Sequence, residues 1–391
     1  MKHILIISNK AAFPTSDGGA VAIKSLCENL TSKNYQLDIV AIQKSQEQRE
    51  KTMPITTKIN EKITQIVFRK KMNFNILEFI KSLFTTTSYQ ASRFYTKEIK
   101  YFIQKLIDKK KYKYVLFESI FSAVYLQKLK ISKSSKLILR AHNVEHKIWQ
   151  DLARNNVMKK IFFLFMSHQI KLMEETIPKH IDYIFTLSGS DEKYFSSIFP
   201  EKTYNIPVTF NTNHAAAKKI NNTIVHLGAM DWKPNVEGIN WFMHEVLPLI
   251  KKMKHNIQIH IAGKGMPKKY FNYNDETTIV KGKIKNVKNY IMSKEIMFVP
   301  LFSGSGIRIK ILEGMSFGLP IISTSKGAEG IPYTHLENII IANTANEFCN
   351  AISLLIENKK LAKKIGTNGQ LLIKKYFSKH FAINQLNNII D

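Results

Sequence analysis

The sequence predicts an α/β protein of two domains, each built around a parallel sheet. The chain has 391 residues, of which 44% are hydrophobic and 23% charged, as in a soluble globular protein with room for two domains of common size. Short apolar runs alternate with amphipathic helical segments in both halves, which is typical of parallel sheets covered by helices. A polar, poorly periodic stretch at residues 206–222 predicts the linker between the two halves.

Strand–helix alternation begins at the N-terminus. Residues 2–7 form an apolar run that predicts a strand, and residues 20–32 and 37–42 predict a helix and a second strand. Gly18 and Gly19 close the long loop before the helix. Such a pair is found in plain turns, and also where a backbone approaches a phosphate or a sugar closely.

The middle of the first half is less regular. Residues 68–84 mix aromatic and basic side chains, which fits either a helix lying on an anionic membrane or a core-facing helix with a lysine-rich solvent face. Residues 114–117 predict a strand that ends at Glu118, and residues 137–139 predict the next one.

Residues 140–146, Arg-Ala-His-Asn-Val-Glu-His, follow that last strand directly. Open α/β sheets keep ligand-binding groups at the carboxyl ends of their strands, so His142 is a candidate site residue. His142, Glu145 and His146 could also be ligands of a metal, but no further ligand occurs at a suitable spacing, and we expect no metal site.

A long helix is predicted for residues 155–177, where Pro178 stops it. Its apolar segment, residues 161–166, fits burial in the core or a supplementary membrane contact. A strand at residues 182–187 and a helix-capping turn at residues 188–191 complete the first half.

The second half begins with a strand at residues 223–227 and a glycine-initiated loop at residues 228–238, in which Lys233 is the only cation. A helix from Val236 is expected to bend or end near Pro248. Further elements are predicted by the same patterns: strands at residues 257–261 and 278–280, a helix near Val287, and helices at residues 345–356, 359–368 and 369–390.

Residues 296–324 carry the clearest functional pattern of the chain. An apolar strand and a Ser/Gly turn at residues 303–306 lead into a predicted helix at residues 307–317, and a strand follows at residues 319–322. The N-terminus of such a helix offers free amide groups to an anion. Arg308 and Lys310 in its first turn oppose the helix dipole, and an anion such as phosphate would explain their presence.

The stretch from Gly304 to Ile331 resembles the donor-binding signature of glycosyltransferase family 4, the "group 1" retaining glycosyltransferases. The family carries two glutamates with seven residues between them. Glu313 matches the second, which in the family binds the ribose hydroxyls of the sugar nucleotide. The first would fall at Ser305, so the chain departs from the pattern there. Residues 142–145, His-Asn-Val-Glu, are similar to an element of the family's N-terminal domain.

This resemblance implies the GT-B fold, in which two Rossmann-like domains face each other across a cleft and a C-terminal helix crosses back to the first domain. The implied limits are residues 1–205 for the acceptor-side domain, 206–222 for the linker, 223–370 for the nucleotide-sugar domain and 371–391 for the returning helix.

The resemblance also implies transfer of a sugar from a nucleotide-diphosphate sugar to a hydroxyl acceptor, with retention and without a metal or cofactor. The acceptor would be a glycan or a lipid-linked precursor of a cell-surface polysaccharide. The residues expected to take part in catalysis are His142, Arg308 and Lys310. Those expected to bind the donor are Gly18, Gly19, Lys233, Gly304, Ser305, Gly306, Ile307 and Glu313.

The net charge of +28 requires its own explanation. It fits an anionic membrane surface, nucleic acid or anionic substrates, and part of it fits lysine-rich codon usage. No signal peptide is expected, and Cys27 and Cys349 lie in apolar helical contexts as free thiols, so we expect a cytoplasmic protein, peripheral on the inner face of the cell membrane if the charge is functional.

Three alternatives to the transferase remain. Only the positive charge favours a nucleic-acid-binding protein, since no zinc knuckle, RNP-type aromatic motif or basic heptad region is present. We therefore expect no nucleic-acid partner. A nicotinamide enzyme would need a complete dinucleotide fingerprint, which neither glycine-rich loop has. A non-catalytic GT-B scaffold would explain Ser305, although Arg308, Lys310 and Glu313 are all present.

Overall fold

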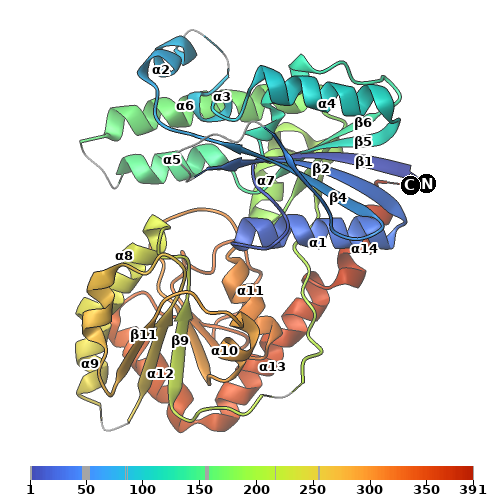
Figure 1. Ribbon diagram of the computed structural model, residues 1–391. Helices are drawn as coiled ribbons and strands as arrows, with labels where there is room; N and C mark the ends of the chain where they lie inside the picture. The colour runs from blue at the N-terminus through green and yellow to red at the C-terminus, as the bar shows by residue number, and fades with distance from the viewer. Residues whose placement is uncertain are drawn as a thin grey trace. The chain divides into compact units, whose positions relative to one another are not determined.

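The computed structural model describes residues 2–45, 53–83, 85, 87–154, 158–215, 217–253 and 256–390. The chain forms two compact units (Figure 1). Unit 1 comprises Met1–Val208 together with Ala382–Asp391, and unit 2 comprises Thr209–Phe381. The last helix, α14 (Lys379–Asn387), therefore supplies most of its residues to unit 1.

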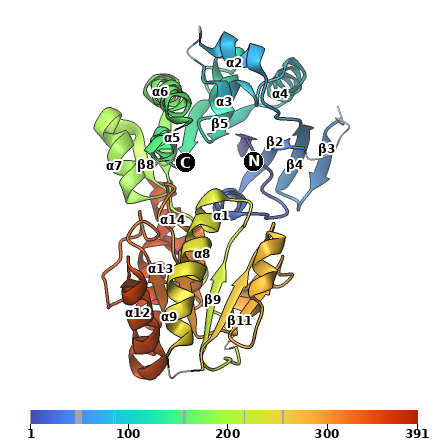
Figure 2. The ribbon, with the colours of Figure 1, turned by 90° about the vertical axis from the view of Figure 1, so that its left-hand side faces the viewer.

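Unit 1 is built on an eight-stranded sheet in its described part. The strand order is β3-β4-β2-β1-β5-β6-β7-β8, and every neighbouring pair is parallel except β3 and β4, which pair antiparallel at the edge (Figure 2). The strands are β1 (Lys2–Ser8), β2 (Tyr35–Lys44), β3 (Ile55–Lys58), β4 (Ile63–Lys70), β5 (Tyr112–Glu118), β6 (Lys136–Ala141), β7 (Tyr183–Thr186) and β8 (Thr203–Asn205).

Both faces of this sheet are buried, which explains the continuous apolar character of its central strands. Alternate residues of β1 enter two different cores: Ile4 and Ile6 join one, Leu5 and Ile7 the other. Helix α1 (Gly18–Ser32) and α14 cover the first face. Other helices of the unit are α2 (Ile76–Ser82), α3 (Tyr89–Ser92), α4 (Lys97–Lys109), α5 (Glu145–Arg154), α6 (Lys160–Thr176) and α7 (Gly189–Ile198).

Two helices predicted in unit 1 differ from those observed. Residues 68–70 belong to β4, so the helix expected over residues 68–84 is the short α2. The long helix expected from residue 155 begins at Lys160 in α6, while residues 155–157 lie outside the described residues. Ser188 caps α7 by accepting a hydrogen bond from the Asp191 amide, as predicted.

Unit 2 contains a six-stranded sheet in its described part, and each neighbouring pair is parallel. Its order, β11-β10-β9-β12-β13-β14, corresponds to 3-2-1-4-5-6 in chain order, which is the Rossmann arrangement. The strands are β9 (Thr223–Leu227), β10 (Gln258–Ala262), β11 (Thr278–Lys281), β12 (Ile296–Val299), β13 (Ile321–Ser323) and β14 (Ile340–Ile341).

The helices of unit 2 are α8 (Lys233–Trp241), α9 (Leu247–Lys251), α10 (Val287–Met292), α11 (Ile309–Ser316), α12 (Ala345–Glu357) and α13 (Lys359–Tyr376). A π-helical segment, Phe242–Val246, joins α8 to α9 just before Pro248, so the predicted disturbance at that proline is present. Helix α13 continues through Gly369, where a break is predicted. A Cβ at this glycine would stand 3.3 Å from Met315 Cγ, so the glycine makes room for the packing of α13 against α11.

Among the described residues, none of the helices combines the length and apolar character that a membrane span requires. Cys27 and Cys349 are both buried free thiols, as predicted.

Candidate functional site

In each sheet the strand order reverses once, at the point where ligands bind in open α/β folds. In unit 1 the reversal falls between β1 and β5, and in unit 2 between β9 and β12. The loops that leave the carboxyl ends of these strands are where such sheets hold their ligands. The two groups of predicted site residues lie on or next to these loops, and each group is described within its own unit.

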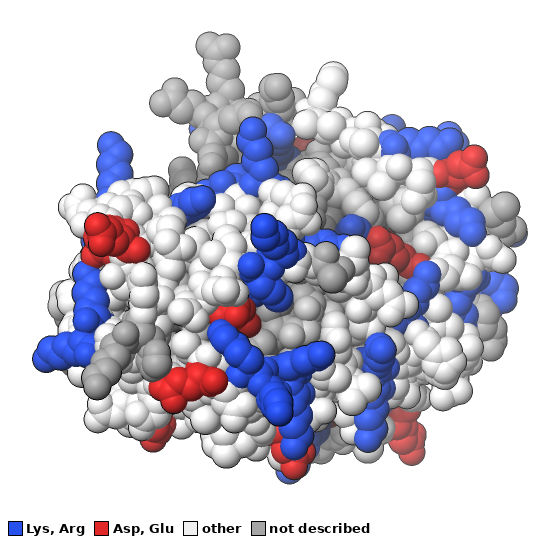
Figure 3. All heavy atoms as spheres, turned by 90° about the horizontal axis from the view of Figure 1, so that it is seen from below, with Lys and Arg blue, Asp and Glu red and all other residues white. Residues whose placement is uncertain are grey.

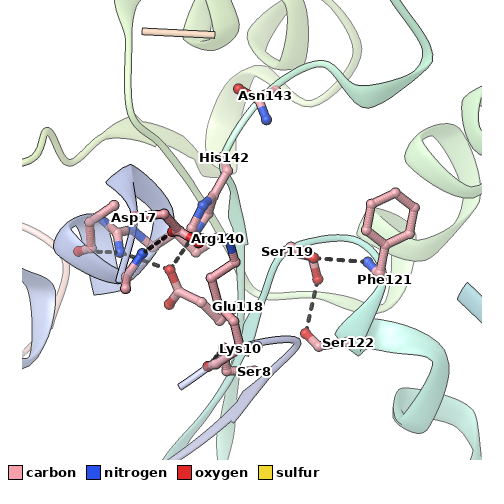
Figure 4. Close-up of polar contacts among 12 residues, drawn as sticks. Ser8, Lys10, Asp17, Glu118, Ser119, Phe121, Ser122, Arg140, His142 and Asn143 are labelled. Atoms are coloured by element: carbon pink, nitrogen blue, oxygen red, sulfur yellow. Dashed lines mark hydrogen bonds and ion pairs between the residues drawn. The ribbon is translucent and has the colours of Figure 1, made fainter. Parts of the chain in front are cut away.

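In unit 1, a buried ion-pair network joins Glu118 at the end of β5 to two residues from β6 and its following loop (Figure 4). Glu118 Oε1 accepts hydrogen bonds from Arg140 Nη1 at 2.8 Å and from the His142 ring at 2.5 Å. Burial opposes ionisation of Glu118, but the Arg140 guanidinium and His142 outweigh it and hold the pKa of this carboxyl below its ordinary value.

An ionised Glu118 determines which nitrogen of His142 can reach a ligand. The carboxylate only accepts hydrogen bonds, so Nε2 of His142 must carry the proton that points at it. This leaves Nδ1 on the opposite edge of the ring, and the His142 side chain is 13% exposed. Arg140 also donates to the Ala22 carbonyl of α1 at 2.9 Å and so ties the network to the first helix.

Gly18 and Gly19 are the first two residues of α1, and a second ion pair lies next to them, in the loop that leaves β1. Lys10 Nζ lies 3.1 Å from Asp17, which caps α1 by accepting from the Ala20 amide (Figure 4). A Cβ at Gly19 would stand 2.8 Å from Lys10 Nζ, so this glycine makes room for the lysine.

Glu145 and His146 belong to a separate cluster at the start of α5. Glu174 of α6 accepts from the Glu145 amide at 2.6 Å and from His146 Nδ1 at 2.5 Å. Burial raises the pKa of the Glu145 carboxyl to about 7, although Asn143 donates a hydrogen bond to it at 2.9 Å. His142 therefore pairs with Glu118 and His146 with Glu174, in two different networks.

In unit 2, Arg308 shapes the glycine loop after β12. It stands just before α11 with an extended backbone, so the helix begins at Ile309 and not at residue 307 as predicted. The Arg308 side chain is 5% exposed and donates to the carbonyl oxygens of Ser305 at 2.5 Å and Gly306 at 2.9 Å. Gly304 and Gly306 adopt φ values of 91° and 82°, which favour glycine and allow this tight loop.

Lys310 lies in the first turn of α11 and reaches the loop that follows β9. Its Nζ donates to Asn235 Oδ1 at 2.7 Å, and burial together with the Arg308 charge lowers the pKa of Lys310 to about 7. A Cβ at Gly228 would stand 2.6 Å from Lys310 Nζ, 2.8 Å from Asn235 Nδ2 and 2.9 Å from His226 Nε2. Three nitrogen-bearing side chains therefore converge next to this glycine.

His226 offers the lone pair of its Nε2 atom next to Gly228. The pKa of the buried ring is well below its ordinary value because of desolvation and the nearby Lys310, so the imidazole is neutral. Its Nδ1 donates to the Phe298 carbonyl at 3.1 Å, which leaves Nε2 as an acceptor. Among the described residues Nε2 has no hydrogen-bond partner.

Glu313 lies one turn after Lys310 on α11. Burial raises the pKa of its half-buried carboxyl, and no described residue forms a hydrogen bond or ion pair with that carboxylate.

Lys233 is exposed at the start of α8, and the Ser305 and Ile307 backbones belong to the loop around Arg308. Within unit 2 the structure thus brings Gly304–Lys310 together with the β9 loop, while Lys233 stands on that loop's solvent side.

Several residues of these networks were not singled out from the sequence as site residues. In unit 1 they are Lys10, Asp17, Glu118 and Arg140, and in unit 2 they are His226 and Asn235. Each lies at or just beyond the carboxyl end of a strand, or at the N-cap or in the first turn of the helix that follows. Strand position was the signal that could have found them. In the part of the chain that the structure describes, no group of three or more His, Cys, Asp or Glu residues is placed to hold a metal ion.

Comparison with known proteins is consistent with this geometry. Residues 221–358 match the family described as Glycosyl transferases group 1. A relative from Klebsiella pneumoniae, described as an uncharacterized 44.6 kDa protein in the cps region, is 25% identical over 403 residues, which span 98% of this chain and 100% of the relative.

Solved structures of glycosyltransferases share the fold of the whole chain. A sucrose-phosphate synthase from Thermosynechococcus elongatus has a TM-score of 0.71 at 14% identity, with 100% of this chain and 98% of that chain covered. A mutant of TarM from S. aureus, in complex with fondaparinux, alpha-GlcNAc-glycerol and UDP, has a TM-score of 0.70 at 11% identity, with 99% of each chain covered. HepE from Anabaena, in complex with UDP-glucose, has a TM-score of 0.63 at 10% identity, with 98% of each chain covered. The protein therefore has the GT-B fold, and residues 221–358 of its second unit match the glycosyl transferases of group 1.

Proposed function

We propose that this glycosyltransferase moves a sugar from a nucleotide-diphosphate sugar to a hydroxyl acceptor, with retention at the anomeric carbon. The observation that carries the proposal is the arrangement on α11, where the Glu313 carboxylate lies one turn after Lys310 and beside the loop held by Arg308. A carboxylate without a protein partner can accept hydrogen bonds from ribose hydroxyls, and two cations can neutralise a diphosphate.

The chemistry then depends on how the leaving group is stabilised. The bond between the anomeric carbon and the diphosphate oxygen breaks, a bond to the acceptor oxygen forms on the same face, and the acceptor proton passes to the departing diphosphate. Lys310, Arg308, Lys233 and the backbone of residues 304–307 would offset the charge that develops on that diphosphate. These cations can do so without a metal, so we propose a metal-independent reaction with no protein general base.

In unit 1 we propose that His142 contacts the sugar of the donor. The Gly18–Gly19 segment would lie near that sugar or near the diphosphate. Glu118 holds the proton on Nε2, so Nδ1 of His142 would meet a sugar hydroxyl. Loss of one such preorganised contact typically lowers a rate by about 10²–10³.

The acceptor we propose is a glycan or lipid-linked precursor in cell-surface polysaccharide synthesis. The cps-region relative supports this choice, and so does the positive charge of the chain. Lys and Arg side chains are spread over the face drawn in Figure 3, with separate Asp and Glu side chains between them. Such a protein would work in the cytoplasm, at the inner face of the membrane, with no nucleic acid as partner.

A thermal-shift panel with UDP, GDP, ADP, CMP and dTDP tests the donor site. TarM and HepE were solved with UDP or UDP-glucose, so UDP is the first candidate. We expect one nucleotide to raise the melting temperature, with the shift reduced in Glu313→Ala and kept in Glu337→Ala, an exposed glutamate of the same unit. A shift with an oligonucleotide and none with any nucleotide would replace this proposal with polyanion binding.

A further inference from the structure

Unit 1 exposes an apolar surface formed by α2, α6 and the residues flanking them. Nine of the nineteen exposed large hydrophobic side chains found among the described residues lie here. We call this set the α2–α6 surface; it comprises Phe74, Ile76, Leu77, Ile80, Leu83, Met158, Ile161, Leu164 and Leu172. Monomeric proteins seldom expose many large apolar residues close together, so these side chains point to an interaction surface.

The two helices are neighbours, and their exposed residues form helical stripes. Phe79 of α2 packs against Phe162 and Phe165 of α6, with ring centroids 5.5 and 5.8 Å apart. Gln169 of α6 also donates to the Ser82 carbonyl of α2 at 2.7 Å. Both ribbon views place α2 beside α6 (Figures 1 and 2).

Since α2 is anchored through its aromatic face, its other apolar residues remain outside the core. Leu77 is 66% exposed and Ile80 is 45% exposed. On α6, Ile161 and Leu164 are 85% and 46% exposed, although this segment was expected to be buried if it did not touch a membrane.

Lysines flank these apolar residues in the sequence. Residues 71–83 and 158–176 contain five lysines and three glutamates, and one of the glutamates, Glu174, is buried against His146. Lys81, Lys159 and Lys160 are exposed next to the apolar residues. The surface therefore combines apolar side chains with an excess of positive charge.

We propose that the α2–α6 surface docks onto an anionic lipid bilayer, with its apolar side chains among the upper acyl chains and its lysines at the headgroups. Helices with large apolar residues and flanking lysines lie in this way at membrane interfaces. A second copy of the chain fits less well, because a two-fold contact would place lysines opposite lysines. The proposal does not depend on sugar transfer.

Vesicle flotation tests the surface directly. The purified full chain is mixed with phosphatidylcholine vesicles with or without phosphatidylglycerol. We expect flotation with the anionic vesicles, weakened by salt, and about a tenfold or greater loss of bound protein in the double variant Leu77→Glu/Ile161→Glu, because two large side chains no longer enter the lipid. The matched control is Leu336→Glu/Leu371→Glu, which places the same charges at exposed leucines of unit 2 and should float like the wild type.

Melting curves and the nucleotide thermal shift, measured on both variants, show whether fold and donor site are intact. Intact melting with lost flotation supports the proposal whatever the nucleotide result. Equal flotation of wild type and Leu77→Glu/Ile161→Glu overturns it, as does an absence of wild-type flotation. Sedimentation that shows a wild-type dimer, dissociated by the same variant and without flotation, would assign the surface to a second copy.

Discussion

The charge of Lys310 depends on the groups that surround its buried side chain. Its Nζ donates a hydrogen bond to the neutral side-chain amide of Asn235. The neutral ring of His226 and the charged Arg308 are the other groups near this amine. No described carboxylate forms an ion pair with it. An anionic ligand would therefore be the counter-charge that this lysine lacks.

The pH dependence of nucleotide binding tests this view of Lys310. Its pKa is about 7 in the free protein, and a bound diphosphate would raise it. Affinity should therefore be full below pH ~7 and fall as the pH rises, by up to about tenfold per pH unit while the complex stays protonated. Titration calorimetry with UDP between pH 7 and 9 measures this, in a range where the phosphate, with a second pKa near 6, keeps a nearly constant charge.

Lys310→Arg supplies the control, because arginine stays charged over this range. It should bind with a flatter pH profile than the wild type. A wild-type affinity that is constant from pH 7 to 9, or a decline that persists in Lys310→Arg, would remove Lys310 from the diphosphate site.

At the scale of single residues, sequence reasoning could name His142, Lys310 and Glu313 but not their partners. Glu118 and His142 are 24 positions apart and meet only because β5 and β6 are adjacent and parallel. Asn235 and Lys310 are 75 positions apart and meet because β9 and β12 are neighbours. Strand order decides these pairings, and one sequence read along its length does not contain it.

At the scale of elements, the packing of α8 against the chain after β12 depends on one glycine. A Cβ at Gly238, inside α8, would stand 1.8 Å from the Pro300 carbonyl oxygen. Replacing a helix glycine by alanine usually stabilises a protein by up to about 1 kcal/mol. At Gly238 the clash with the Pro300 carbonyl should instead make the alanine destabilising.

We therefore expect Gly238→Ala to lower the free energy of unfolding by about 1–3 kcal/mol, since the helix must shift away from Pro300. Urea denaturation followed by circular dichroism measures the change. Gly282→Ala is the matched control in the same unit, because a Cβ there meets nothing within 4 Å, and it should stay within about 0.5 kcal/mol of the wild type. Equal midpoints for the two variants would refute the packing argument.

Elements were predictable where local pattern decides them and less so where side chains override it. The strand before the glycine loop, the stop signals after α11 and the cap of α7 follow from local residues. The start of α11 does not, because Arg308 turns back onto the carbonyls of Ser305 and Gly306 and keeps its own backbone extended. Likewise α2 is shorter than its sequence pattern, because residues 68–70 pair with β2.

At the scale of the whole molecule, the chain returns to its first unit at its C-terminal end. Leu386 and Ile390 are fully buried in the core formed by α1 and the even-numbered residues of β1, and Lys33 Nζ donates to the Ile390 carbonyl at 2.7 Å. The family resemblance led us to expect such a returning helix from residue 371. In the structure α13 extends to Tyr376 within unit 2, and the residues of unit 1 resume at Ala382.

The fold of unit 1 should therefore depend on a residue that lies near the far end of the sequence. Leu386→Ala removes a fully buried side chain and should destabilise unit 1 by about 2–5 kcal/mol. Hydrogen exchange measured by mass spectrometry reads each unit separately: amides of β1 and β2 should exchange at least about tenfold faster, while those of β9 and β10 keep their wild-type rates. Leu371→Ala, at a leucine that is 55% exposed in unit 2, should change neither set. Unchanged exchange in β1 would mean that the last helix is not part of the core of unit 1. Equal acceleration in β1 and β9 would mean that the two units unfold together, whereas the expected pattern would make them separately stable bodies joined by a shared chain.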